Sequence, residues 1–217
     1  MSQHPPLVSR RISIRLLPAP PSEPTDTLVL NGGGTSRFFT DFRPLLQDPG
    51  DCEWVFAGCK EKLANGKNEW VHLIDNRGPS ESPDVGTSET LLNGDELERG
   101  EMNNPETREL CAYEEVWRDE DVPPGSKVVV AQLRRGDGIH GICVQVGTDY
   151  QGVVQDTTGH VTAQRSRYEN GEWGVTEKYG EGVDLLPLAF DDLGQPIKGV
   201  TDKDEEWEIV ENYTYTG

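Results

Sequence analysis

The chain has 217 residues and a formal charge of −19, from 39 acidic and 20 basic side chains. A field of that sign repels phosphate backbones and anionic lipid surfaces, so we expect no nucleic-acid partner and no membrane insertion. Glycine (24 residues) and proline (15 residues) are frequent beside only 34% hydrophobic residues, which predicts an all-β protein with many turns.

Targeting, redox and cofactor signals are absent from the sequence. No apolar run has the length of a signal-peptide core or approaches the roughly 20 residues that span a bilayer, so we expect a soluble, cytoplasmic protein. The four cysteines, Cys52, Cys59, Cys111 and Cys143, form no CxxC pair, which predicts free thiols. The chain contains no P-loop, GxGxxG, GxSxG or HExxH motif, so we expect neither a cofactor nor a metal.

The first half of the chain alternates short extended segments with turn signals. Strands are predicted over 11–17, 27–30, 37–42, 52–59 and 69–75, with a hairpin at the Asn-Gly-Gly-Gly-Thr turn of residues 31–35. If the strands at 52–59 and 69–75 pair, Trp54 and Phe56 share one surface with Trp70 and His72. A neutral imidazole there could exchange a proton, although a purely structural histidine would give the same pattern.

Residues 76–105 are dominated by Gly, Pro, Ser, Asn and acidic side chains, and we interpret them as a long connection with one helical turn or short strand near Thr90. An extended pattern resumes at 108–117, where Cys111, Tyr113, Glu115 and Trp117 face one way. The DVPPGS segment that follows predicts a boundary between an N-terminal domain, residues 1–122, and a C-terminal domain, residues 123–217.

The segment 127–168 predicts a meander of about four antiparallel strands, at 128–133, 141–146, 152–155 and 161–168. Neither face of the meander is purely apolar, which is typical of a small barrel with a partly polar interior that holds a ligand. Exposed edge strands would give the same sequence pattern. Arg165 and Arg167 share a face with Val161 and need a partner. That partner is either an anionic or enolic ligand or, as the acidic excess favours, an internal glutamate such as Glu115.

Beyond the meander, we predict a strand at 173–179, a short helical or irregular segment at 185–190, and a strand at 206–212 that returns to the first strand of its sheet, as barrel closure requires.

Several segments resemble a known family in the same order along the chain. They are EWVFAG at 53–58, the tryptophan strand 70–75, EEVW at 114–117, GICVQVGTDYQGVVQ at 141–155 and WEIVE at 207–211. They resemble the fungal Hri family, relatives of a budding-yeast casein kinase 1-interacting protein. The resemblance implies two small lipocalin-like antiparallel β-barrels packed together, and a homodimer. Shorter loops between Trp70 and Arg108 weaken the transfer of any partner site carried on loops.

Two functions remain open. In the first, the barrel is a cofactor-independent fungal secondary-metabolite cyclase or pericyclase of the hetero-Diels–Alder type, which joins a tropolone quinone methide to a terpene, as the resemblance to small fungal barrel proteins implies. His72 and Arg167 are then the catalytic donors. An apolar or aromatic substrate is held by Trp54, Phe56, Trp70, Tyr113, Trp117 and Arg165. In the second, the protein is a non-enzymatic interaction protein, a kinase- or translocon-associated adaptor, whose barrels are filled with side chains and whose acidic loops at 75–105 recruit a basic protein partner.

Overall fold

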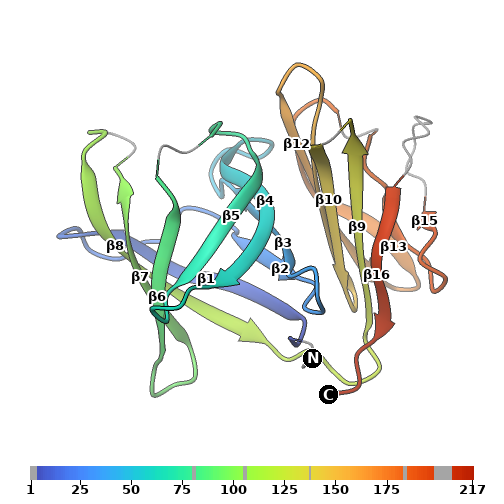
Figure 1. Ribbon diagram of the computed structural model, residues 1–217, viewed down its shortest axis with the longest axis horizontal. Helices are drawn as coiled ribbons and strands as arrows, with labels where there is room; N and C mark the ends of the chain where they lie inside the picture. Colours follow the sequence, from blue (N-terminus) through green and yellow to red (C-terminus); the bar gives the residue numbers. More distant parts are fainter. Residues whose placement is uncertain (1–3, 80–81, 105–106, 137, 183–184, 198–206) are drawn as a thin grey trace.

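A computed structural model describes residues 4–79, 82–104, 107–136, 138–182, 185–197 and 207–217, and its regular elements are antiparallel strands. Figure 1 shows two units side by side, a closed barrel and a second sheet, with both chain termini between them. The predicted all-β class is confirmed. The described part of the chain contains no helix that is long and apolar enough to cross a membrane.

The N-terminal unit is a closed barrel in which each strand pairs with its neighbours along the chain and β8 pairs with β1. Its strands are β1 (Leu7–Leu16), β2 (Leu28–Asn31), β3 (Phe38–Pro44), β4 (Cys52–Lys62), β5 (Asn68–Asp75), β6 (Asp84–Thr90), β7 (Glu96–Asn103) and β8 (Leu110–Glu120). A closed barrel of eight strands has room for side chains or for one small ligand.

The C-terminal unit is a six-stranded sheet in the order β13-β12-β11-β10-β9-β16. Its strands are β9 (Lys127–Arg135), β10 (Gly138–Val146), β11 (Asp149–Gln155), β12 (Val161–Glu169), β13 (Glu172–Tyr179) and β16 (Trp207–Thr214), with a small hairpin of β14 (Ala189–Phe190) and β15 (Pro196–Ile197) beside it. The predicted meander forms β9 to β12. The last strand does return to β9, but β13 and β16 do not pair among the described residues, so this unit is an open sheet where a second closed barrel was expected.

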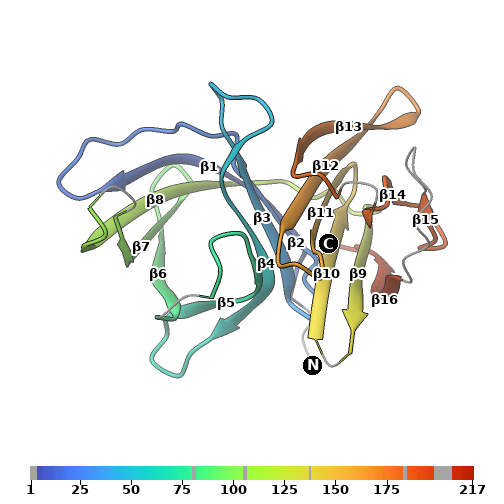
Figure 2. The ribbon, with the colours of Figure 1, turned by 90° about the horizontal axis from the view of Figure 1, so that it is seen from above.

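The main hydrophobic core lies between the two units, outside the barrel. Figure 2 shows β2, β3 and β4 beside β10, β11 and β12. The outward side chains of the barrel, such as Leu28, Phe42 and Val55, pack against Ile142 and Val153 of the sheet. Because the barrel wall buries its outer face here, its inner face does not have to supply the core and is available for polar groups.

The other face of the second sheet is covered by the segment before and after β14. Val129, Cys143 and Tyr150 of the sheet pack against Leu186 and Phe190. The segment 185–190 is irregular and ends in β14, in agreement with the prediction. Residue 206, the first residue of the predicted last strand, lies outside the described residues.

The predicted long connection at 76–105 is wrong in its larger part, because this segment contains the barrel strands β6 and β7. Both strands are rich in acidic and small residues. Their inner face lies against a polar interior and much of their outer face lies in water, so neither face shows the apolar period that marks a half-buried strand.

Candidate functional site

A cavity of about 950 Å³ lies inside the barrel. That volume lies at the upper end of the about 300–1,000 Å³ typical of small-molecule pockets. Five of the predicted substrate-binding residues line it, together with His72 and a set of charged side chains. The principal lining residues are Phe39, Asp41, Arg43, Glu53, Trp54, Phe56, Lys60, Trp70, His72, Asp75, Arg77, Asp84, Glu98, Tyr113, Glu115 and Trp117.

The aromatic wall is built by the pairing of β4 with β5, as the sequence predicts. The ring of Phe56 stacks on the imidazole of His72 with centroids 4.2 Å apart, and Trp54 meets the same imidazole edge-on at 5.4 Å. A register shift between Ala57 and Gly58 lets these side chains converge. The indole of Trp70 lies farther along β5, beneath the ammonium group of Lys60 at 5.0 Å.

His72 is held between two carboxylates. Its Nδ1 lies 2.7 Å from Asp75 Oδ2 and its Nε2 lies 3.1 Å from Asp84 Oδ2. Asp75 also accepts a hydrogen bond from Trp54 Nε1 at 2.8 Å, which fixes its orientation. Burial alone lowers the pKa of His72, but the hydrogen bonds to Asp75 and Asp84 outweigh it and raise the pKa to about 9. At neutral pH the ring is therefore an imidazolium that donates from both nitrogens.

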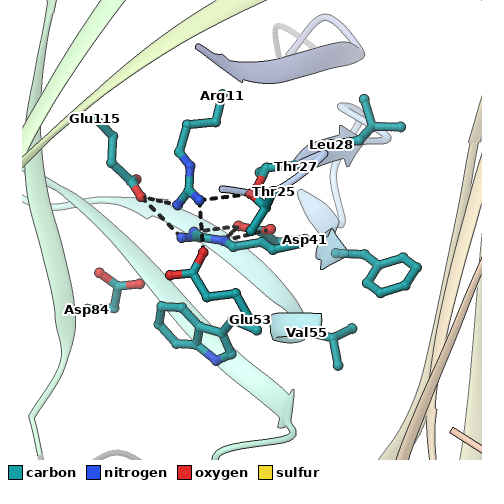
Figure 3. A network of polar contacts seen from close by, with 12 residues as sticks. Arg11, Thr25, Thr27, Leu28, Asp41, Glu53, Val55, Asp84 and Glu115 are labelled. Carbon is teal, nitrogen blue, oxygen red and sulfur yellow. Dashed lines mark hydrogen bonds and ion pairs between the residues drawn. The ribbon is translucent and has the colours of Figure 1, made fainter. Parts of the chain in front are cut away.

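A buried ion-pair network borders the cavity, and Figure 3 shows its side chains. Arg11 Nη1 and Arg43 Nη1 both donate to Glu115 Oε1, at 2.7 Å and 3.1 Å. Arg11 also donates to Glu53 at 2.9 Å and to Glu23 at 2.8 Å. The side chains of Arg11, Arg43 and Glu115 are each no more than 5% exposed, so the network lies in a low-dielectric interior.

Arg43 connects this network to the aromatic wall. It donates to both oxygens of Asp41, with the shortest contact at 2.8 Å from Nη2 to Oδ2, and its guanidinium carbon lies 5.0 Å from the Trp54 ring centroid and 5.9 Å from that of Trp117. Burial lowers the pKa of Arg43, but Asp41 and Glu115 raise it well above its ordinary value. The guanidinium is therefore a fixed positive charge in the wall.

Alternation along β3 explains how these polar groups reach the interior. Asp41 and Arg43 line the cavity, while Thr40 and Phe42 lie on the opposite face toward the second sheet, since side chains change face at each residue. In β1 a register shift after Arg11 accompanies an inward arginine and an Ile12 that is 40% exposed. The buried arginines of β1 and β3 were missed from the sequence, because charged residues in a half-apolar strand are ordinarily assigned to the solvent face.

A second buried acid, Glu98, lies beside Glu115 on the neighbouring strand β7. Tyr113 Oη donates to Glu98 Oε1 at 2.7 Å, and Glu98 is 7% exposed. Burial and the charges of Glu115 and Asp84 raise the pKa of Glu98 to about 8. The carboxyl is therefore largely protonated at neutral pH. Glu98 was also missed, because it lies within the segment interpreted as a connection.

The structure separates two predicted site residues from the others. Arg165 and Arg167 belong to β12 of the second sheet and border a smaller pocket of about 360 Å³, lined by Arg10, Asp26, Glu120, Asp149, Thr176 and Glu177 as well. Arg165 donates to Asp26 Oδ2 at 2.9 Å and to Gln151 Oε1 at 3.1 Å, so its partner is not the predicted Glu115. Arg167 lies within ion-pair distance of Asp149 and Glu169.

Neither arginine joins His72 in the barrel cavity. The sequence predicted a ligand pocket within the meander, but the large cavity lies in the barrel. One face of the meander packs on the barrel wall and the other packs on the segment around β14. In the described ranges, no group of three or more His, Cys, Asp or Glu side chains has the arrangement of a metal site.

Comparison with known proteins gives a family and a fold. A family model described as Protein HRI1 matches residues 7–211. The crystal structure of an uncharacterized protein from Saccharomyces cerevisiae is similar over 97% of this chain and 100% of that chain, with a TM-score of 0.77 and 19% sequence identity. No curated protein matches.

Proposed function

The chain belongs to the HRI1 family, and we propose that its barrel binds a small, largely aromatic molecule and acts on it without a cofactor. The observation that carries the proposal is the cavity of about 950 Å³ walled by Trp54, Phe56, Trp70 and Trp117. Large flat side chains around an unfilled volume suit a flat apolar ligand, which they hold by burial of its surface and by ring stacking. An adaptor whose barrels are filled with side chains would not need this cavity.

The reaction that we propose is a cyclisation of the hetero-Diels–Alder type, with a tropolone quinone methide and a terpene as the reactant class. Such a cycloaddition exchanges π bonds for σ bonds within the reactants and gains or loses no atoms, so it needs no cofactor. An aromatic cavity favours it by holding two reactants in contact, which replaces a bimolecular encounter by a positioned one. Of the predicted catalytic pair, His72 alone borders the cavity, as an imidazolium whose positive charge can stabilise developing negative charge while its two N–H groups donate to Asp75 and Asp84.

Binding of a flat aromatic ligand tests the proposal. The ligand should quench tryptophan emission and raise the melting temperature, because a molecule that binds only the folded state stabilises it. Trp70→Ala should weaken binding roughly tenfold by removing a wall, whereas Trp173→Ala, in β13 of the other unit, should leave the affinity unchanged. His72→Phe should lower turnover more than affinity. If no flat aromatic compound quenches the emission or shifts the melting temperature, the proposal fails.

A further inference from the structure

The inner face of β8 carries a hydrogen-bond donor with no acceptor in the described part of the chain. Trp117 is 8% exposed, lines the cavity, and its Nε1 has no hydrogen-bond partner there. An indole N–H can only donate, so it needs an acceptor atom that the described residues do not supply. A buried donor left unpaired is unfavourable, so an acceptor in this position stabilises the complex.

Glu98 supplies a second donor beside the first. In the register of β7 and β8, Glu98 lies opposite Glu115, and Trp117 is the next residue of β8 on the same face. Residues related in this way are diagonal neighbours across a strand pair, so the carboxyl and the indole border the same part of the cavity. Tyr113, the diagonal neighbour on the other side, already donates to Glu98 Oε1.

Charged groups around Glu98 decide its state. Glu115 and Tyr113 face it from β8, Asp84 from β6 and Lys60 from β4. Burial and the two carboxylates favour its neutral form more than Lys60 favours the ionised one. A neutral carboxylic acid has an O–H group that can donate a hydrogen bond, whereas an ionised carboxylate can only accept.

The same surroundings select against an anionic ligand. Glu115 is shared by Arg11 and Arg43, and Asp84 pairs with His72, so these three positive charges already have carboxylate partners, while the ammonium group of Lys60 lies over the Trp70 ring at 5.0 Å. A ligand carboxylate beside Glu98 would add a further negative charge to a low-dielectric space. An uncharged oxygen acceptor meets both donors without that cost.

We infer that the barrel cavity takes a neutral, flat ligand with a carbonyl oxygen, and that this oxygen accepts hydrogen bonds from Trp117 and Glu98. The inference rests on the proposed function and adds the two residues that recognise the carbonyl oxygen of the ligand. Donation to a conjugated carbonyl withdraws electron density from the attached π system. In a cyclisation that uses the carbonyl as part of its diene, the two residues would therefore also lower the barrier.

Three probes of one ring system test the inference: 9-fluorenone, fluorene and fluorene-9-carboxylate. Each is titrated into the full-length protein at pH 6.5, and dissociation constants are taken from tryptophan quenching and checked by calorimetry. We expect fluorenone to bind about tenfold more tightly than fluorene, since each hydrogen bond contributes roughly two- to tenfold in affinity. The carboxylate should bind more weakly than fluorene.

Two variants assign the effect to the two donors. Trp117→Phe keeps a ring but removes the N–H, so fluorenone affinity should fall by about two- to tenfold while fluorene affinity stays within about twofold. Glu98→Gln keeps a donor at every pH. Wild-type affinity for fluorenone should therefore fall as Glu98 ionises above pH 8, and the Gln variant should not show this fall. Any loss of fluorenone affinity near pH 9 that both proteins share is assigned to the deprotonation of His72.

The outcomes separate this inference from the proposed function. If fluorenone and fluorene bind with equal affinity, the two donors are satisfied by solvent and the inference is overturned, while the aromatic cavity retains its function. Tighter binding of the carboxylate, an unchanged fluorenone affinity in Trp117→Phe, or a wild-type affinity that falls no more than that of the Gln variant above pH 8, overturns it too. If none of the probes binds, both the inference and the proposed function fail.

Discussion

Arg11 and Glu115 meet inside the barrel, where Arg11 Nη1 donates a hydrogen bond of 2.7 Å to Glu115 Oε1. Arg43 donates to the same oxygen at 3.1 Å, so one carboxylate joins side chains from β1, β3 and β8. Removing one partner of such a network is more costly than its net stabilisation, because it leaves a buried charge without compensation.

Glu115→Ala should therefore lower the free energy of unfolding by about 3–5 kcal/mol. Denaturation in urea, with the slope checked for two-state behaviour, measures the loss. Glu89→Ala is the matched control, because Glu89 pairs with Arg99 at the surface and its side chain is 57% exposed. That variant should lose less than about 1 kcal/mol. Equal losses in the two variants would contradict the assignment of Glu115 to a buried network.

His72 should make stability depend on pH in the alkaline range. Its pKa is raised from 6.5 to about 9 in the folded protein by Asp75 and Asp84, against the opposing effect of burial. A raised pKa means that the folded state holds the proton more tightly. The stabilisation is thus complete below about pH 6.5 and is lost as the pH rises through 9. The full effect corresponds to about 3 kcal/mol.

The difference in unfolding free energy between wild type and His72→Gln, measured from pH 6 to pH 10, isolates this contribution, since the other titrating groups cancel. It should shrink by most of its value across that range. His160→Gln serves as the control, because the His160 side chain is 87% exposed, and its difference from wild type should stay flat. A His72 difference that grows with pH would contradict the ion-paired imidazolium.

The sequence predicts the strands whose two faces differ and fails where both faces are polar. The pairing of 52–59 with 69–75, and the common face of Tyr113, Glu115 and Trp117, follow from alternation alone, and these residues line the cavity. β7 was missed and β6 was expected only as one alternative, a short strand near Thr90, because most of their inward residues are acids and glycines. Alternation reports a contrast between faces, and no contrast exists there.

The buried arginines could not be assigned from the pattern either. Arg11 alternates with apolar neighbours in the way that solvent-facing arginines do, whereas Arg165 shares a face with Val161 and was suspected to point inward. What brings each of them inside is a set of partners far away in sequence, Glu115 for Arg11 and Asp26 for Arg165. A local pattern carries no information on such pairs, so an inward arginine can be suspected but its partner cannot be identified.

Arg165 should stabilise the junction between the two units. Its Nη2 donates to the backbone oxygens of Asp26 and Phe42, both at 3.0 Å. Arg165→Met keeps much of the apolar stem but leaves these acceptors and Gln151 without their donor, which should cost about 2–4 kcal/mol in urea unfolding. Arg167→Met, two residues along the same strand at a side chain that is 43% exposed, should cost less than about 1 kcal/mol.

The four cysteines should react as free thiols. All four are unpaired, and Cys143 is fully buried with its pKa raised by burial. Thiol titration of unfolded, non-reduced protein should find four reactive groups. In the native protein Cys143 should react last, because only the thiolate attacks the reagent and burial disfavours it. Fewer than four groups in the unfolded protein would indicate a disulfide.

Gly100 should be required for the contact between Tyr113 and Glu98. Its backbone is in an ordinary extended conformation, so the only demand on this position is space. A Cβ built here would lie 2.7 Å from the Tyr113 ring and hydroxyl oxygen, closer than real Cβ atoms come. Gly100→Ala must therefore displace Tyr113, which should cost about 1–3 kcal/mol in urea unfolding through strain and through loss of the 2.7 Å hydrogen bond to Glu98.

Gly174 in β13 provides the control, because it also lies in a strand but a Cβ there would have no atom within 4 Å. Gly174→Ala should be neutral or stabilise the protein by up to about 1 kcal/mol, since alanine loses less conformational entropy on folding. If Gly100→Ala is as stable as Gly174→Ala, the Tyr113 ring does not lie over Gly100. The same result would mean that the Tyr113 hydroxyl is not positioned to orient Glu98 toward the cavity. A destabilised Gly100→Ala that still binds fluorene, but no longer prefers fluorenone, would connect this packing contact directly to ligand recognition.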